Sequence, residues 1–425
     1  MSIQQHQYVS KIAYTILLII IALFLFNHTP NVGYDTPSYI HFSEKRPPIY
    51  PLFIWAFQWA GHYQFQYIMW VQSILTCCAL AYARHWLKKN IHVPDILVFC
   101  VMLVVLITIC FHYQMWYIQS EGLTFPFFIF TFFLLMNCFQ RFELKKIIWL
   151  STWVAVLILT RQQFYYFYGI FILLCAWYLY KKIAFNRIIL SACIFLISIL
   201  TTTLIDWSYH NLKNGHFEGE QLSAIVLSIQ PIYLAQPDSV HYFSNNTERA
   251  VYFNIQHQLQ KKKLNPESAR LNILIPQYFE YAYEEYARNY IAIQTIIADE
   301  AYSNRSFSEG NQLLKNISKT LVQREFKKNL LFYAWKVTDS MGGIPGFLFF
   351  SLLLFGTLWN LLRQKNESIE MSHLFVALAI TITFFNALLV AVAEPALPPY
   401  FCYTQFLLYC LAAIFSKKIF FAHDR

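Results

Sequence analysis

Charged side chains are scarce in this 425-residue chain: Asp, Glu, Lys and Arg make up 13% of it, against about a quarter in ordinary soluble domains. Hydrophobic residues make up 57% and aromatic residues 19%. This composition excludes a disordered chain and a typical soluble enzyme. It predicts an all-α, polytopic membrane protein.

The sequence also lacks the usual metal-binding and disulfide motifs. It contains no CxxC pair and no HExxH motif, and its nine cysteines all lie in apolar stretches. A thiol in such a stretch packs as a small hydrophobic group. A zinc site or a disulfide framework is therefore not expected, and we predict no cofactor from these motifs.

Apolar runs long enough to cross a membrane recur along the chain. A crossing helix needs roughly 20 mostly apolar residues, because the hydrocarbon core is about 30 Å thick. About ten segments qualify: Ile12 to Phe26, Tyr67 to Ala83, Ile96 to Phe111, Leu123 to Phe139, Ile147 to Thr160, Phe164 to Tyr180, Ile188 to Ile205, Ile344 to Leu362, Leu374 to Ala393 and Phe401 to Phe421. We interpret the first as a retained anchor, with a cleaved signal peptide as the alternative.

The basic residues predict the orientation of these spans. If the N-terminus is cytoplasmic, fifteen Lys and Arg residues fall in short cytoplasmic segments and three in short outer loops. Short cytoplasmic loops carry such an excess of positive charge. The remaining fourteen lie in one long outer segment from Trp207 to Gly343.

That long segment is expected to form a mainly helical extracytoplasmic domain, residues 207–343, between transmembrane parts 1–206 and 344–425. Its fourteen basic and thirteen acidic residues give a net charge of about +1, so nucleic-acid binding has no support. Periodic apolar residues predict amphipathic helices at Ser268 to Ala301 and at Asn311 to Trp335.

With this topology, charges of both signs gather at the outer ends of the spans. Asp35, Lys45 and Arg46 lie in the first outer loop, residues 27–66, and three more lie at span ends: Glu121, Arg161 and Glu394. Charges at a bilayer edge are costly unless they are paired or hydrated, so they are functional candidates. The alternative is that each side chain only extends to the lipid headgroups.

The sequence of the first outer loop predicts its local structure. Thr36 followed by Pro37 predicts an N-cap with a short helix after it, and Asp35 just outside the helix start. Arg46-Pro47-Pro48 cannot continue a helix, so the chain should run extended there. The aromatic stretch from Tyr50 to Trp59 is too short to span and is expected in the interface.

Several segments resemble a known family. Gly33-Tyr34-Asp35 together with Arg46-Pro47-Pro48-Ile49-Tyr50-Pro51, then Ser120-Glu121-Gly122-Leu123 and Leu159-Thr160-Arg161-Gln162, are similar to motifs of the GT-C integral-membrane glycosyltransferases that use polyprenyl-phosphate-linked sugars. That class includes bacterial aminoarabinose transferases and protein O-mannosyltransferases. The resemblance covers about the first 180 residues. Gln162 replaces the usual proline, and Pro399 stands where many relatives have arginine before Tyr400.

The resemblance implies an inverting sugar transfer from a polyprenyl-phosphate donor to a glycan, lipid or protein acceptor at the outer face of a bacterial cell membrane. Asp35 would be the general base, and Arg46 and Arg161 would hold the phosphate. The further substrate-binding candidates are Glu121, Lys45, Tyr50, Glu394 and Tyr400. Some members of the class hold a divalent ion with carboxylates, so Asp35 and Glu121 stay open as ligands.

Two other functions stay open. A polymerase or ligase of undecaprenyl-diphosphate-linked glycans would place catalytic arginines in the large outer segment, where Arg249, Arg270, Arg288, Arg305 and Arg324 lie. A transporter or flippase would place charges near mid-span. The predicted spans have almost no such charge.

Overall fold

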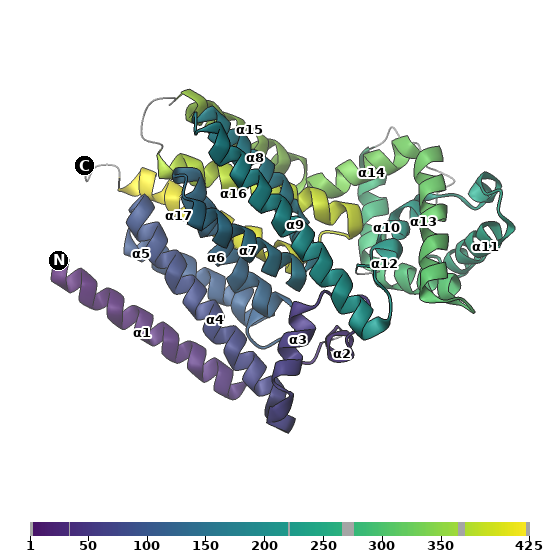
Figure 1. Cartoon of the computed structure of the whole chain (residues 1–425), viewed down its shortest axis with the longest axis horizontal. Coiled ribbons are helices and arrows are strands. Elements are labelled where there is room, and N and C mark those ends of the chain that lie inside the picture. The colour runs from purple at the N-terminus through teal and green to yellow at the C-terminus, as the bar shows by residue number, and fades with distance from the viewer. Residues whose placement is uncertain (1–2, 34, 220–221, 266–275, 364–369, 422–425) are drawn as a thin grey trace. The chain divides into compact units, whose positions relative to one another are not determined.

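The computed structural model describes residues 3–33, 35–219, 222–265, 276–363 and 370–421. Within these ranges the chain is helical and has no β-strand; an isolated bridge joins Asn31 and Tyr117 (Figure 1). The all-α prediction is confirmed for the described residues.

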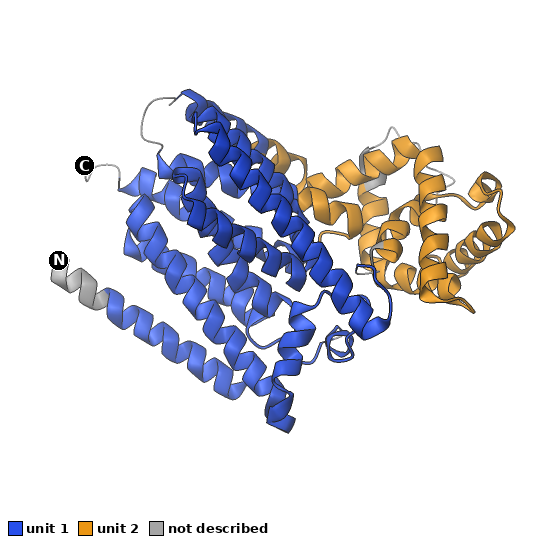
Figure 2. Ribbon diagram, in the orientation of Figure 1, with its two compact units in different colours: residues 1–219, 351–386, 398–425 blue, residues 220–350, 387–397 orange. Residues whose placement is uncertain are grey.

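The chain divides into two compact units (Figure 2). Unit 1 comprises residues 1–219, 351–386 and 398–425, and unit 2 comprises residues 220–350 and 387–397. Helix α9 (Phe185–Asn214) belongs to unit 1 and continues beyond position 206, the predicted end of the first transmembrane part.

Nine helices of the described ranges are long and apolar enough to cross a membrane. They are α1 (Ile3–Asn27), α4 (Gln64–Trp86), α5 (Asp95–Val105) with η3 (Leu106–Gln114), α6 (Glu121–Gln140), η4 (Gln162–Tyr166) with α8 (Phe167–Tyr180), α9, α15 (Gly343–Arg363), α16 (Met371–Ala393) and α17 (Pro398–Phe420). One of the ten predicted spans, Ile147 to Thr160, is not among these nine and lies in α7 (Leu144–Thr160). With 17 residues, α7 is about 25 Å long, which is short for a crossing helix.

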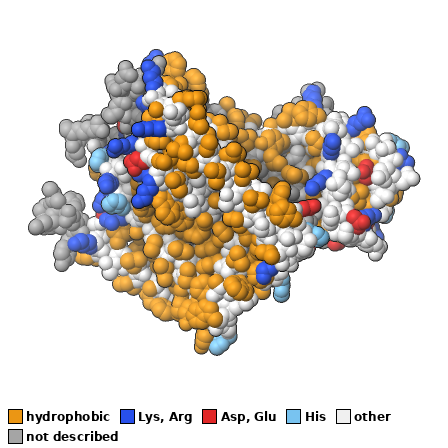
Figure 3. Space-filling view, in the orientation of Figure 1, with side chains coloured by type: hydrophobic (Ala, Val, Ile, Leu, Met, Phe, Trp, Pro, Cys, Tyr) orange, Lys and Arg blue, Asp and Glu red, His pale blue; other side chains and the backbone are white. Residues whose placement is uncertain are grey.

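The surface of unit 1 is strongly apolar. Figure 3 shows hydrophobic side chains over most of the visible face of this unit. Large residues such as Ile172 and Leu352 are 71% and 72% exposed. In water this exposure would cost about 25 cal/mol per Å², whereas lipid chains solvate it. The nine apolar helices and this surface indicate a membrane-embedded protein.

The helices of unit 1 give it two chemically different ends. One end, which we call the Arg161 end, carries the start of α6 and the end of α7. The start of α17 lies at this end too, because Gln163 donates a hydrogen bond to the Tyr400 carbonyl. The other end, the Lys418 end, carries the end of α17, where Lys417 donates to the Ile91 carbonyl between α4 and α5. Arg84 and Asp95 form an ion pair at that same end.

Helix α6 is the central helix of unit 1. Its residues are buried along nearly the whole length, including Phe125, Phe128 and Phe132, and it packs against α4 and α7. Such a helix is apolar on all sides because protein surrounds it. Two other short helices, α2 (Thr36–Ile40) and α3 (Ile49–Ala56), lie in the first loop and are followed by η1 (Gln58–Tyr63).

Unit 2 is a small helical domain with its own aromatic core. Its helices are α10 (Leu222–Leu234), η5 (Pro237–Tyr242), α11 (Asn246–Lys261), α12 (Pro276–Tyr302), α13 (Phe307–Arg324) and α14 (Phe326–Asp339). Tyr252, Tyr286 and Phe332 are fully buried in the core. A capping box between Ser306 and Glu309 starts α13, because each side chain binds the other residue's backbone N–H.

One predicted helix of this unit is wrong. The segment from Asn311 to Trp335 forms two helices that break at Glu325, whose backbone leaves the helical region at φ −115° and ψ 37°. The break lets Phe332 pack on Tyr286, and the Glu325 carboxylate accepts a hydrogen bond from Ser239. Of the other predicted helix, residues 276–301 lie in α12, and 268–275 lie outside the described residues.

We expect Gly122→Ala to destabilise unit 1. An added Cβ at this helical position would lie 2.1 Å from Nε2 of Gln72. Gln72 cannot move freely, because it is fully buried and binds the Tyr50 hydroxyl and the Tyr117 carbonyl. Overpacking of this kind costs about 1–3 kcal/mol. Thermal unfolding of the detergent-solubilised protein measures the change.

Gly356→Ala is the matched control, since this glycine also lies inside an apolar helix. A Cβ at Gly356 would meet no atom within 4 Å, so the midpoint should stay the same or rise. Equal midpoints for the two variants would contradict the close contact at Gly122.

Candidate functional site

The first loop is anchored to the segment that precedes α6. Asn31 donates its N–H to the Trp116 carbonyl at 2.8 Å and accepts from the N–H of Ile118 at 3.0 Å. The Thr36 hydroxyl, which is fully buried, donates to the Ile118 carbonyl at 2.9 Å. These bonds fix the start of α2 beside the start of α6.

The expected short helix is present, but Thr36 is not its N-cap. Asp35 occupies the cap position, its side chain makes no capping bond, and Pro37 lies in the first turn. The Thr36 hydroxyl cannot cap the helix because it binds Ile118, which belongs to another loop. The prediction of an extended chain at Arg46-Pro47-Pro48 is wrong at Pro48, which caps α3 with helical backbone angles. Just before it, the Arg46 N–H donates to the Ser43 carbonyl at 3.0 Å in a turn.

The Asp35 carboxylate forms an ion pair with Arg46. Arg46 also donates from Nε to the Ser38 hydroxyl at 2.8 Å, and its guanidinium lies 4.7 Å from the centre of the Tyr39 ring. The Asp35 side chain is 43% exposed and that of Arg46 19%. The carboxylate is therefore held in place and open to solvent. Next to it, the Lys45 ammonium has no partner among the described residues.

A second, more buried pair joins Glu121 at the start of α6 to Arg161 after α7. Their side chains are 8% and 15% exposed. Arg161 also approaches the Ser120 hydroxyl at 3.5 Å, and its guanidinium lies 4.5 Å from the centre of the Tyr400 ring. The charge of Arg161 is thus balanced by one carboxylate and one aromatic face.

Tyr39 connects the two ion pairs. Its ring lies beneath Arg46, and its hydroxyl donates to the Ser120 hydroxyl at 3.2 Å. Ser120 in turn donates to Glu121 at 3.3 Å. The structure therefore brings together the predicted residues Asp35, Arg46, Glu121, Arg161 and Tyr400, which come from four separate parts of the sequence. We call this group the two-pair site.

Two predicted residues lie elsewhere. Tyr50 is fully buried, its hydroxyl donates to Gln72 at 2.9 Å, and its ring packs edge-on against Tyr39 at 4.8 Å. Tyr50 therefore packs behind Tyr39 and presents no surface to solvent. Glu394 belongs to unit 2, where its charge acts on Lys336 and Tyr286.

Sequence reasoning did not single out the polar residues that hold the two-pair site. Gln163 donates to the Asn386 side chain at 2.6 Å and to the Tyr400 carbonyl at 2.7 Å, which fixes the start of α17. The hydroxyls of Thr124 and Tyr403 lie 2.6 Å apart. Uncharged polar residues inside apolar spans are the signal that could have found them, because each needs a partner there.

The two-pair site places cationic groups that can bind an anion beside a carboxylate that can accept a proton. Guanidinium groups bind phosphate oxygens, and an open carboxylate accepts protons. Arg161 uses Nη1 for Glu121 and Ser120, so other N–H groups of this guanidinium remain for a ligand. Among the described residues, no group of three or more His, Cys, Asp or Glu side chains is placed to hold a metal ion.

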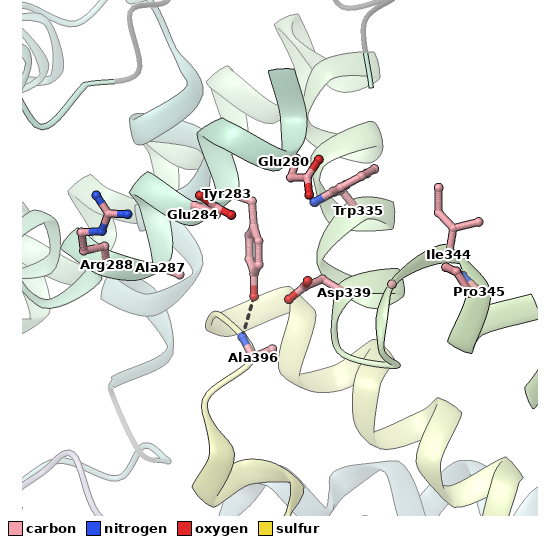
Figure 4. A pocket seen from close by; sticks show the side chains of 11 residues that line it. Glu280, Tyr283, Glu284, Ala287, Arg288, Trp335, Asp339, Ile344, Pro345 and Ala396 are labelled. Carbon is pink, nitrogen blue, oxygen red and sulfur yellow. Dashed lines mark hydrogen bonds between the residues drawn. The ribbon is translucent and has the colours of Figure 1, made fainter. Parts of the chain in front are cut away.

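Unit 2 contains a hollow of about 580 Å³ that sequence reasoning missed (Figure 4). Glu280 and Glu284 of α12 and Asp339 at the end of α14 line it, together with Trp335 and Tyr283. Burial raises the pKa of Asp339, and the charges of Glu280 and Glu284 raise it further, whereas the Tyr283 hydroxyl lowers it. Arg288 also lines the hollow, so three carboxyl groups face one guanidinium.

A lysine is fully buried near this hollow. Lys336 of α14 is 1% exposed, donates to the Gln230 side chain at 3.2 Å and lies 5.2 Å from the centre of the Tyr286 ring. Burial lowers the pKa of Lys336 to about 7, although the charge of Glu394 acts in the opposite direction. The ammonium is thus destabilised by desolvation more than Glu394 stabilises it.

No protein-family model, curated protein or solved structure matches this chain.

We expect Glu121→Gln to destabilise the protein far more than Asp35→Asn. Removing Glu121 leaves the buried Arg161 charge without its carboxylate, which costs about 3–5 kcal/mol. The Asp35 pair is partly exposed, so its loss should cost about 1 kcal/mol or less. Thermal unfolding in detergent compares the two. The double variant Glu121→Leu with Arg161→Met should recover most of the loss, and a double variant as unstable as Glu121→Gln would contradict this explanation.

We expect Lys336→Met to stabilise unit 2 at pH 6 and to lose that advantage by pH 9. The unfolded lysine titrates near its ordinary pKa of 10.5 and the folded one at about 7. Between these values the unfolded state binds more protons, so the stability of the parent rises with pH. At pH 6 the parent buries a charge that methionine removes, a gain of about 1–3 kcal/mol.

Thermal unfolding of the full chain at pH 6 and pH 9 measures this difference. Lys315→Met is the control, because Lys315 is exposed on α13 and its replacement should shift the midpoint equally at both values. If Lys336→Met raised the unfolding midpoint equally at both pH values, the lowered pKa of the buried Lys336 would be contradicted.

Proposed function

We propose that this protein is a membrane glycosyltransferase that moves a sugar from a polyprenyl-phosphate donor to a glycan, lipid or protein acceptor on the extracytoplasmic side of a bacterial cell membrane. The observation that supports this proposal is the two-pair site: an open carboxylate and two arginines, joined through Tyr39 and Ser120, at one end of an apolar helix bundle. This end is where the donor's phosphate and sugar would lie in a membrane.

In the proposed reaction Asp35 takes the proton of an acceptor hydroxyl while the hydroxyl oxygen attacks the anomeric carbon. The bond from that carbon to the phosphate oxygen breaks, and the polyprenyl phosphate leaves with the electron pair. Arg161 and Arg46 stabilise the charge that develops on the phosphate. The anomeric configuration is inverted, because the displacement is a single step.

The Asp35–Arg46 pair fits this scheme as an exchangeable contact. A donor phosphate competes with Asp35 for the Arg46 guanidinium, and the carboxylate is then released to act as a base. Glu121 keeps Arg161 in place, because that pair is buried and shares Ser120 with the Tyr39 hydroxyl. Lys45, whose ammonium is unengaged among the described residues, lies next to Arg46 for a further phosphate contact.

The contacts of the unit 2 arginines favour this function over a glycan polymerase. Arg249 binds the Phe243 carbonyl, Arg288 binds Glu285, and Arg305 binds backbone carbonyls of its own turn. Arg324 lies over the Tyr242 ring, and Arg270 is outside the described residues. The four described arginines therefore make local contacts within unit 2.

We expect Asp35→Asn to lower sugar transfer by about 100-fold or more, since a general base contributes about 10²–10⁴. The purified protein in nanodiscs would be incubated with a panel of undecaprenyl-phosphate-linked sugars and a membrane extract as acceptor. Mass spectrometry would measure the release of undecaprenyl phosphate. Arg161→Lys should retain more activity than Arg161→Ala, because lysine keeps the charge.

Asp95→Asn is the matched control. Asp95 also pairs with an arginine, Arg84 at 2.8 Å, but at the Lys418 end, so its loss should leave transfer within a few-fold of the parent. Normal turnover by Asp35→Asn would remove Asp35 from the base role. Consumption of diphosphate-linked glycans alone would favour the polymerase, and movement of a lipid-linked sugar across the membrane without transfer would favour a flippase.

A further inference from the structure

A crevice of about 270 Å³ lies between α15, α16 and α17 within unit 1. Its lining changes from apolar to polar along the helices. Asn360, His373 and Lys418 line the part at the Lys418 end, and Leu352, Val376 and Phe415 line the part farther from that end. Leu352 precedes Asn360 by eight residues of one helix, which corresponds to about 12 Å. The crevice therefore has a polar end, which we call its mouth, and an apolar end.

Protein atoms do not close the crevice on the α15 side. Within the unit 1 part of α15, only Thr357 and Leu361 are buried, and a Cβ at Gly356, which lines the crevice, would meet nothing within 4 Å. The end of α15 is nevertheless fixed, because the Tyr180 hydroxyl of α8 donates to the Leu362 carbonyl at 2.8 Å. An apolar gap beside lipid gains dispersion contacts when a hydrocarbon chain enters it.

The mouth of the crevice is basic. Lys418 lines it, and two more basic residues, Lys417 and Arg363, lie in the last turns of α17 and α15. Glu370 is the carboxylate that pairs with Lys418. Lys418 lies 3.3 Å from Glu370 and 3.4 Å from Nε2 of His373, and 44% of its side chain is exposed. Lysine has three donors, so one remains for a ligand. Figure 3 shows Lys and Arg gathered at this end of unit 1.

We propose that this crevice binds an anionic glycerophospholipid. One acyl chain lies along Leu352, Val376 and Phe415, and the phosphate accepts hydrogen bonds from the Lys418 ammonium and the Asn360 amide. Basic pockets between membrane helices are a recurrent form of lipid headgroup recognition. The lipid fills the space between α15 and its neighbours and so holds α15 against α16 and α17. This site is separate from the two-pair site and does not depend on sugar transfer.

The test is native mass spectrometry of the full chain with phosphatidylglycerol and phosphatidylcholine that have the same acyl chains. The parent should retain phosphatidylglycerol at about ten-fold lower concentration than phosphatidylcholine, and phosphatidylglycerol should raise its unfolding midpoint. Lys418→Gln should remove this preference. Gly356→Leu should reduce binding of both lipids, because a Cβ at this position meets no atom within 4 Å and a leucine side chain would extend into the crevice from there.

Lys417→Gln is the matched control. It removes the same charge from the adjacent position, but Lys417 donates to the Ile91 carbonyl at 2.7 Å and does not line the crevice. The proposal is overturned if Lys417→Gln and Lys418→Gln weaken phosphatidylglycerol binding equally, if the parent does not distinguish the two lipids, or if Gly356→Leu binds as the parent does. Binding of undecaprenyl phosphate in place of phosphatidylglycerol would also overturn it.

If Gly356→Leu folds poorly, phosphatidylglycerol binding by Gly356→Ala and by Lys418→Gln is compared instead. Alanine leaves most of the crevice open, so this variant should bind phosphatidylglycerol as the parent does, whereas Lys418→Gln should not. Loss of binding in Gly356→Ala with a normal unfolding midpoint would show that the lipid binds elsewhere.

Discussion

The arrangement of the Arg161 end depends on one electrostatic constraint: the buried charge of Arg161 must be balanced inside an apolar bundle. Glu121 supplies the opposite charge and Tyr400 the aromatic face. Leaving either ion unpaired there would cost several kcal/mol. The constraint therefore joins the start of α6, the end of α7 and the start of α17. Because Ser120 bonds to both Glu121 and Tyr39, the same constraint reaches the first loop.

The two ion pairs of this site differ in how readily either partner can be exchanged. The Glu121–Arg161 pair is almost fully buried, so exchanging its partner carries a large desolvation penalty. The Asp35–Arg46 pair is partly exposed, and water or a ligand can replace either partner at low cost. The proposed sugar transfer needs this combination: a cation that stays in place, beside a carboxylate whose partner can be exchanged. Tyr39 keeps both pairs in one place, since it contacts Arg46 with its ring and Ser120 with its hydroxyl.

The sequence predicted the helices of unit 1 because hydropathy depends on local composition alone. It also predicted that Asp35, Arg46, Glu121 and Arg161 share one end, which follows from counting spans. It did not predict Tyr39 and Ser120 as the connection, since a tyrosine and a serine in loops have no distinctive pattern. Thr36 shows the same limit. The Thr36-Pro37 pair favoured an N-cap, but the Thr36 hydroxyl donates to the Ile118 carbonyl, 82 positions away in the sequence. In unit 2, the helical spacing of apolar residues predicted one helix from Asn311 to Trp335, but the chain leaves the helical conformation at Glu325.

The opposite ends of unit 1 show how one bundle can hold charge in two ways. At the Arg161 end the charges are paired within the protein and partly withdrawn from solvent, so their positions are set by side-chain geometry. At the Lys418 end the basic residues outnumber their carboxylate partners and remain more exposed. Charges that the protein does not neutralise are neutralised by what surrounds it, and for membrane helices this is the headgroup layer. The proposed sugar donor would meet the first arrangement, and the proposed anionic phospholipid would meet the second.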